Sequence, residues 1–487
     1  MHCSIHSNVE SNETPRVPIG HLDSGPSSPV VSPEQYDLTL QLPAEILVDI
    51  FDMCSPPGED GFDGLSDATT PAQEVKRLAK KYLLQLSQVS SRWHVLVMGT
   101  PMLWRIIVVD TTLWSDCAIS STILIELVTA SLNRGAEHPL TLQVAVEDEE
   151  SHGSEVLELL CRHAQRWQNV HFWSAFSSFQ AIAAVRGNLP LLEKLEISQT
   201  DDWMECDVFE IAPRLTHLTV TGWAGRVPTV PWAQLQYFRY FSFDPENILY
   251  PLALLGNSFS ANARCDLTIY TTNTAELPPV ISHVSDFSLT VGAFNPGMEV
   301  LGPILDCLSF PHLDGLSLMG RYGEDEHSLP WQQPHFLRFA ARSSLSTSLT
   351  SLEMARTTIV DDELVGCLVV LPSLVQLIIS DEFAPHSLIT DSLLRQLIWM
   401  PDPGASLVPR LNFVCLTSIL DFSDDMYWEF VSSRIGPAQW DGSRLEAKIY
   451  WLPGRTRELS STFLSKGFDL DVEGKINFTA RPDPERT

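Results

Sequence analysis

The octapeptide PLLEKLEI at residues 190–197 decides the fold, because related octapeptides recur along the chain. In each, a leucine is followed by aliphatic residues three and five positions later, the pattern L-x-x-φ-x-φ, and a proline stands just before it. Spacing by two residues is typical of a β-strand with one buried side. The other close copies are PRLTHLTV at 213–220, PHLDGLSL at 311–318 and PSLVQLII at 372–379.

Looser copies and intervening helical patterns complete the repeat. The looser copies begin at Leu235, Val284, Leu349 and Leu411, and residues 266–270 form a further strand candidate. Helix-like segments lie between strands, at 298–308, 335–341, 363–371 and 392–400. A repeated strand–turn–helix unit predicts the α/β class and a curved solenoid with a stacked parallel sheet. We expect residues 425–435 to be helical, 445–451 a strand, 456–467 helical and 468–472 a closing strand.

A different pattern precedes the repeats. In LPAEILVDIF at residues 42–51, Pro43 suits a first helical turn, and Ile46, Leu47, Ile50 and Phe51 follow at helical spacing, with Cys54 one turn later. These residues predict a helix with one apolar face. Two more helices are expected, one with apolar residues from Val75 to Leu86 and a basic opposite face at 76–81, the other carrying Val89 and Trp93. That basic face is also what an ordinary solvated helix would show.

Three segments in this order resemble an F-box: LPAEI at 42–46, VSSRW at 89–93 and PMLW at 101–104. The chain departs from the compact F-box by an insertion at about 55–80 and by Ser90, where the family often has cysteine. With its degenerate leucine-rich-repeat-like region, the chain resembles F-box proteins of mushroom-type (basidiomycete) fungi. The implied division is a disordered tail at 1–36, an F-box at 37–104, a connecting segment at 105–146, a solenoid at 147–480 and a tail at 481–487.

The resemblance implies a non-catalytic substrate-recognition subunit of an SCF-type cullin–RING ubiquitin ligase. The F-box would dock on a Skp-type adaptor, and through it on a cullin scaffold, while the repeats hold a substrate. The residues implied in adaptor binding are Leu42, Pro43, Ile46, Leu47, Ile50, Phe51, Leu86, Val89 and Trp93. Some of these must face inward to hold the helices together, and sequence does not sort them.

Composition limits the possible partners. The 487 residues include 31 Lys+Arg and 61 Asp+Glu, a net charge of −30, so binding to nucleic acid or to an anionic membrane surface is not expected. The longest uncharged apolar stretch, residues 364–379, contains Pro372 and is too short to cross a bilayer. We expect no secretory signal, since no apolar run follows a basic segment near residue 1. The nine cysteines form no C-x-x-C pair, which favours reduced thiols in the cytoplasm or nucleus.

The loops that follow the repeat strands are candidate substrate-binding sites, because a solenoid places them along one edge. Acidic and aromatic residues follow several strands, namely Asp201, Asp202, Trp203, Trp223, Tyr322, Asp325 and Phe383. We hypothesise that this edge binds a partner with basic segments. The alternative is that these are ordinary solvated loops.

No catalytic signature is present: the chain has no G-x-G-x-x-G after a strand, P-loop, G-x-S-x-G or H-E-x-x-H motif. We therefore expect no enzyme activity, cofactor or metal site. Two other functions remain open. One is a repeat scaffold that binds its partner outside any ligase, and the other is an interaction module whose first helices only cap the solenoid.

Overall fold

The computed structural model describes the following residues of the chain: 42–54, 81–110, 121–146, 153–174, 182–199, 206–222, 227–242, 245–255, 263–271, 277–293, 299–321, 328–380, 387–400, 406–418, 421–434, 445–451, 469–470 and 476–479.

A small helical bundle comes first in the chain. It consists of α1 (Ala44–Met53), α3 (Lys81–Ser87), α4 (Ser91–Gly99) and the 3-10 helix η2 (Pro101–Trp104). The rest of the described chain is built on one 15-stranded sheet. Its thirteen parallel strands are β1 (Ile106–Asp110), β2 (Leu140–Val146), β3 (Trp167–Ser174), β4 (Lys194–Gln199), β5 (His217–Gly222), β6 (Tyr237–Ser242), β7 (Arg264–Thr271), β9 (Asp286–Ala293), β11 (Gly315–Gly320), β12 (Ser351–Ala355), β13 (Gln376–Ser380), β14 (Phe413–Ser418) and β15 (Glu446–Trp451).

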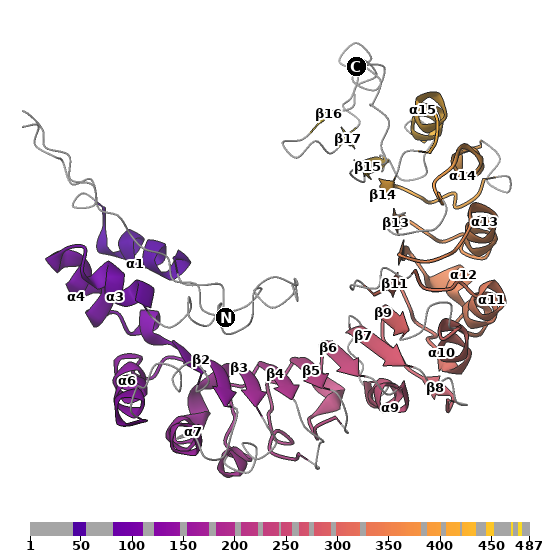
Figure 1. The fold of residues 1–487 in the computed structure, drawn as a ribbon. Coiled ribbons are helices and arrows are strands. Elements are labelled where there is room, and N and C mark those ends of the chain that lie inside the picture. The colour runs from indigo at the N-terminus through magenta and orange to yellow at the C-terminus, as the bar shows by residue number, and fades with distance from the viewer. Residues whose placement is uncertain are drawn as a thin grey trace, which may run out of the picture.

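The parallel strands are neighbours in chain order, so each helix crosses over between adjacent strands. The crossover helices are α6 (Ser121–Arg134), α7 (Gly153–Cys161), η3 (Ala164–Arg166), η4 (Ala183–Val185), η5 (Trp232–Gln234), α9 (Pro245–Leu255), α10 (Leu301–Cys307), α11 (Gln333–Arg342), α12 (Leu345–Ser348), α13 (Asp361–Val369), α14 (Asp391–Leu397) and α15 (Asp424–Ser433). A separate two-stranded sheet pairs β8 (Val280–Ile281) with β10 (Leu308–Ser309). Figure 1 shows a horseshoe in which strands line the inner, concave face, helices cover the outer face, and the bundle sits at one end.

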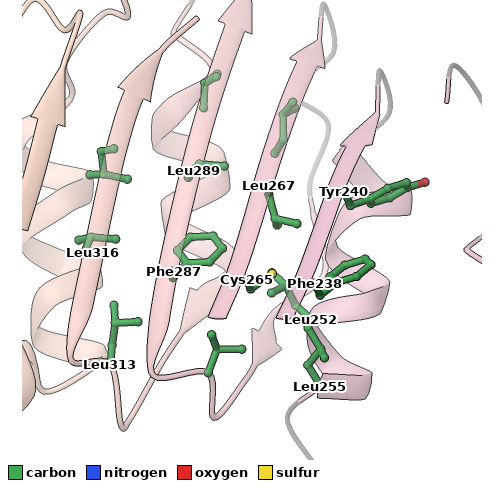
Figure 2. Close-up of a cluster of buried hydrophobic side chains, with 14 of the residues drawn as sticks. Phe238, Tyr240, Leu252, Leu255, Cys265, Leu267, Phe287, Leu289, Leu313 and Leu316 are labelled. Carbon is green, nitrogen blue, oxygen red and sulfur yellow. The ribbon is translucent and has the colours of Figure 1, made fainter. Parts of the chain in front are cut away.

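The core lies between the sheet and the outer helices, and one register runs through it. Phe238, Cys265 and Phe287 stand opposite one another on β6, β7 and β9, and Leu316 continues the row on β11. All four are buried, and Leu252 of α9 packs against the row from the helical side (Figure 2). Large rings alternate with a small thiol along this row, and all of them belong to one buried core.

The first leucine of each repeat explains why the octapeptide decides the fold. Leu192, Leu215, Leu313 and Leu374 lie in the turns before β4, β5, β11 and β13 and are fully buried. Backbone hydrogen bonds extend the ladder into these turns: the Thr350 N–H donates to the Asp314 carbonyl at 2.8 Å, and later turns repeat the arrangement. Each repeat is therefore anchored to its neighbour before its strand begins.

Arginines join consecutive repeats on the helical side, and two of them, Arg166 and Arg434, are buried. Arg434, at the end of α15, donates from Nε to the carbonyl of Leu397 (2.8 Å), and its Nη1 and Nη2 donate to Val408 (3.2 Å) and Leu407 (3.1 Å). Leu397 is the last residue of α14, where backbone carbonyls have no partner within the helix. Burial lowers the pKa of Arg434 to about 10, which still leaves it charged near neutral pH.

The same device occurs twice more. Arg342 donates to the carbonyls of Leu305 (2.6 Å) and Leu308 (2.8 Å) beside α10. Arg166 donates to the His138 carbonyl (2.9 Å) after α6. In each case a guanidinium from one repeat donates to backbone carbonyls of the preceding repeat, at a helix end or in the turn that follows it.

The α/β class and the solenoid of parallel strands are confirmed. β1 and β2 lie within 105–146, the segment expected to connect the two parts, in which residues 139–144 alternate as a strand does. The expected closing strand at 468–472 contains β16 (Asp469–Leu470), which pairs antiparallel with β17 (Ile476–Thr479), and β17 itself was not expected. The tails at 1–36 and 481–487, the insertion at 55–80 and the expected helix at 456–467 lie outside the described residues.

The arginine contacts predict a large cost for Arg434→Ala. Removing the guanidinium leaves buried carbonyls without donors, and we expect the free energy of unfolding to fall by about 3 kcal/mol in urea denaturation. Arg395→Ala, on the exposed side of α14, is the matched control and should change it by less than about 0.5 kcal/mol. Equal effects of the two substitutions would show that the buried arginine carries no special weight.

Candidate protein-interaction surfaces

Helix α1 carries apolar side chains on two sides. Leu47 and Phe51, one turn apart, are fully buried in the bundle. Ile46, Ile50 and Met53 form a second row at helical spacing that is open to solvent, and Met53 is 84 % exposed. A helix that is apolar on both sides is typical of one with neighbours on both sides. The bundle supplies one of those neighbours.

The bundle has its own core, separate from that of the solenoid. The Phe51 ring packs against Trp93 of α4 with centroids 4.7 Å apart. The fully enclosed members of this core are Leu47, Phe51, Leu83, Val97, Leu103 and Trp104. So few large side chains give a small unit little stability, and polar contacts supplement them.

Two hydrogen bonds fix the ends of α4. The Ser90 hydroxyl accepts from the Trp93 N–H at 3.2 Å and caps the N-terminus, which explains why serine can stand there. At the other end, the indole Nε1 of Trp104 donates to the Val97 carbonyl at 2.8 Å. The Arg92 guanidinium also donates to the Leu42 carbonyl, tying α4 to the residue before α1.

The bundle is fastened to the sheet through the segment that contains Trp104 and Arg105. Arg105 forms a two-pronged ion pair with Asp52 near the end of α1, with N–O distances of 2.9 and 3.1 Å. Its carbonyl accepts from the Thr141 N–H of β2 at 3.1 Å. The Arg134 guanidinium lies 4.6 Å from the centre of the Trp104 ring. These contacts hold the bundle against the first strands.

Residues 39–110 match the F-box-like family model. This stretch contains α1, α3, α4, η2 and β1, so the match includes the joint to the sheet. F-box domains generally bind Skp-type adaptors, and proteins that carry them are typically non-catalytic. No match is found among the curated proteins.

The residues expected to bind the adaptor fall into three groups in the F-box-like domain. Pro43, Ile46, Ile50 and Val89 are exposed, and Leu42, Leu86 and Trp93 are half-buried. Leu47 and Phe51 are buried inside the domain, so they offer no surface to a partner while it is folded. Their role in the structure is to hold α1 against α4. The sequence predicted one apolar face on α1, whereas the structure has two, one buried and one exposed.

Three exposed apolar residues of the F-box-like domain were missed: Met53, Leu84 and Val95. Met53 continues the spacing of Ile46 and Ile50, a signal that was assigned to Cys54 instead. Leu84 and Val95 belong to helices whose other apolar residues are buried or half-buried, and spacing alone does not distinguish them.

The solenoid presents a second kind of surface on its concave face, where every second strand residue points away from the core. These positions are mostly polar. On β6 and β7 they form a hydrogen-bonded network in which Asp266 accepts from the Tyr237 hydroxyl at 2.8 Å and from Arg264 Nε at 3.0 Å. The Arg239 guanidinium lies 3.7 Å from the same carboxylate.

The acidic and aromatic loop residues expected to bind substrate lie outside the described residues. They are Asp201, Asp202, Trp203, Trp223, Tyr322, Asp325 and Phe383. The strands that precede them, β4, β5, β11 and β13, are parallel members of one sheet and therefore end at the same edge. We expect the loops to lie along such an edge, and their position there stays a prediction.

The buried thiols of the solenoid are poor nucleophiles. Burial raises the pKa of Cys161 and Cys206 to about 11 and that of Cys307 and Cys367 to about 12. Each is protonated near neutral pH and packs as a small apolar group. Within the described parts of the chain, no three His, Cys, Asp or Glu residues gather as metal ligands would, and no helix is long and apolar enough to cross a bilayer.

The two sides of α1 predict different effects of truncation. Phe51→Ala opens a cavity beside Trp93 and should cost about 3 kcal/mol, which lowers hydrogen-exchange protection of α1 and α4 by about 100-fold. Ile50→Ala removes a side chain that the domain does not enclose, and protection should change by less than about fivefold. Peptides from β11–β13 serve as internal reference. Comparable losses for both variants would contradict the assignment of the two sides.

Proposed function

We propose that this chain is the substrate-recognition subunit of an SCF-type cullin–RING ubiquitin ligase. The F-box-like domain would dock on a Skp-type adaptor, and the adaptor would connect it to a cullin. The solenoid would hold the substrate. The observation that supports this most is the exposed apolar row of α1 within a domain that matches the F-box-like family.

The exposed row of α1 has the chemistry of a helix-in-groove contact. Ile46, Ile50 and Met53 lie along one side of the helix, with exposed Pro43 one turn ahead. Burying such side chains in an apolar groove contributes about 25 cal/mol per Å². Because Leu47 and Phe51 already hold the domain together, the row is free to serve a partner without loss of the fold.

The proposed role is one of proximity and selection, without catalysis by this chain. The thiols described above are held protonated, and ligase chemistry would lie in other subunits. A cytoplasmic or nuclear location would fit reduced thiols and a ligase partner. The net charge of −30 disfavours nucleic acid and anionic membranes as ligands.

We infer that the solenoid is of the leucine-rich-repeat type, with irregular repeats similar to those of mushroom-type fungal F-box proteins. Support comes from the buried leucine before β4, β5, β11 and β13 and from the parallel, consecutive strand order. Repeat solenoids commonly use their extended concave surface for binding.

A scaffold that acts outside any ligase is the second candidate, and a simple capping role for the first helices is the third. The exposed row of α1 favours a partner over simple capping, because a cap with no partner would leave three apolar side chains in water. A scaffold could also bind the adaptor. Recovery of the cullin together with the adaptor is therefore the result that distinguishes a ligase subunit from a scaffold.

The proposal predicts that Ile46→Asp with Ile50→Asp abolishes co-purification of the Skp-type adaptor and of the cullin. Charges placed in an apolar groove should weaken binding by about 30-fold or more, while the domain core is untouched. Ile123→Asp with Leu127→Asp is the matched control, since these α6 residues are also one turn apart and are 49 % and 50 % exposed, against 45 % and 38 % for Ile46 and Ile50. That control should retain the adaptor.

Two results would overturn the proposal. Adaptor binding that survives in the Ile46/Ile50 variant would remove the α1 row from the interface. An adaptor that never co-purifies with the intact chain would exclude the ligase function altogether.

A further inference from the structure

A cluster of arginine and tyrosine side chains occupies the middle of the concave face. On β6 and β7, Tyr237, Arg239, Arg264 and Asp266 form the network described above. The Asp266 side chain is only 12 % exposed and lies beneath its donors, whereas that of Arg264 is 54 % exposed. The groups that face the hollow of the horseshoe are therefore the donors, and the carboxylate lies at the base.

A second group of rings continues the cluster toward the ends of the same strands. Phe241 of β6 and Tyr270 of β7 have ring centroids 5.6 Å apart. The Arg321 guanidinium, directly after β11, lies 3.7 Å from the centre of the Tyr270 ring and 5.5 Å from that of Phe241. Stacking orders a guanidinium and holds its plane against the ring.

Gly292 makes this arrangement possible. It stands opposite Tyr270 in the β7–β9 register, and a Cβ at this position would lie 2.8 Å from a carbon of the tyrosine ring. Small residues also fill the neighbouring concave positions of β9 and β11, namely Ser288, Thr290, Gly315 and Ser317. On this part of the concave face, small side chains of β9 and β11 therefore lie beside the large side chains of β6 and β7.

Guanidinium groups gather in this region, although the whole chain is acidic. We define the Arg–Tyr patch as Tyr237, Arg239, Phe241, Arg264, Tyr270 and Arg321. The patch carries three arginines. Among the described residues, the carboxylates of Asp266 and Asp286 act on Arg264, and Asp314 acts on Asp286; the Asp266 side chain is only 12 % exposed. Arg264, whose side chain is 54 % exposed, and its neighbouring arginines therefore present guanidinium donors that can bind an anionic group.

We propose that the Arg–Tyr patch binds an extended acidic peptide segment of the substrate, with side-chain carboxylates on Arg239, Arg264 and Arg321 and apolar side chains on the rings. Arginine and tyrosine are the residue types that carry most binding energy at protein interfaces, and a guanidinium binds carboxylate in a two-pronged geometry. This rests on the proposed function only in taking the concave face as the substrate surface. It differs from the expectation of a basic partner, which rested on the edge loops.

The test uses the intact chain to select peptides from a displayed library of random linear sequences. The patch predicts selected peptides that are rich in Asp and Glu with interspersed aromatic residues, and affinities that fall as salt is added. Arg239→Gln with Arg264→Gln removes two charges but keeps hydrogen-bonding side chains around Asp266. It should weaken these peptides by about tenfold or more, measured by fluorescence anisotropy.

A matched control separates the patch from net charge. Arg338→Gln with Arg395→Gln makes the same change in charge on the exposed sides of α11 and α14, on the outer face. This control should bind the peptides as the unmodified chain does. Thermal unfolding of both variants, unchanged from the parent, shows that loss of binding is not loss of fold.

Three results would overturn the inference: selection of basic peptides, selection of acidic peptides that both double variants bind equally, and no enrichment over the Arg239/Arg264 variant. Failure of the proposed ligase function is distinguishable from these three results. The Ile46/Ile50 variant changes only the α1 row, so it should select the same acidic peptides as the unmodified chain. Loss of adaptor binding with retained peptide selection supports the patch, and the reverse result contradicts it.

Discussion

The register of the strand side chains that face the core is the constraint on which the rest of the structure depends. Parallel strands in chain order bring Leu218, Phe238, Cys265, Phe287 and Leu316 into one row, and a shift by a single residue in any strand would turn its core residues to the concave face. Leu215, Leu235 and Leu313, buried in the turns before β5, β6 and β11, support that register. With the core-facing side fixed in this way, the residues at the concave positions and in the edge loops can vary without cost to the core.

The core-facing row also accounts for how much of the fold the sequence predicts. The octapeptides locate β4, β5, β11 and β13 because Leu192, Leu215, Leu313 and Leu374 combine a turn signal with burial. β3 was missed although it follows the same spacing, since Trp167 takes the place of the leucine and Val170 and Phe172 follow it. A large ring can fill the same core position as a leucine, but a sequence pattern defined by leucine does not detect it. β1 offers only a continuous apolar run, which fits a buried helix equally well.

The candidate surfaces were less predictable, for a physical reason. Ile46 and Leu47 are both aliphatic, and which of them faces the core depends on where α4 packs, a tertiary fact that the sequence of α1 does not contain. Charged residues raise the same difficulty. In so acidic a chain, Arg434 and Arg264 read as ordinary surface residues, yet the first is enclosed by backbone carbonyls and the second stands over a covered aspartate. Net charge describes the average surface and does not locate its exceptions.

The joint at Trp104 and Arg105 has a mechanical consequence for the whole horseshoe. The thirteen parallel strands extend about 60 Å along the arc at a spacing of about 4.8 Å, so the solenoid acts as a lever whose pivot is a few side chains wide. An angular change at the Asp52–Arg105 pair displaces β15 more than β2, because the displacement grows with distance from the pivot. The stiffness of that pivot therefore sets how narrowly the far strands are aimed in space, and a ligand held in mid-arc is positioned more tightly than one held at the tip.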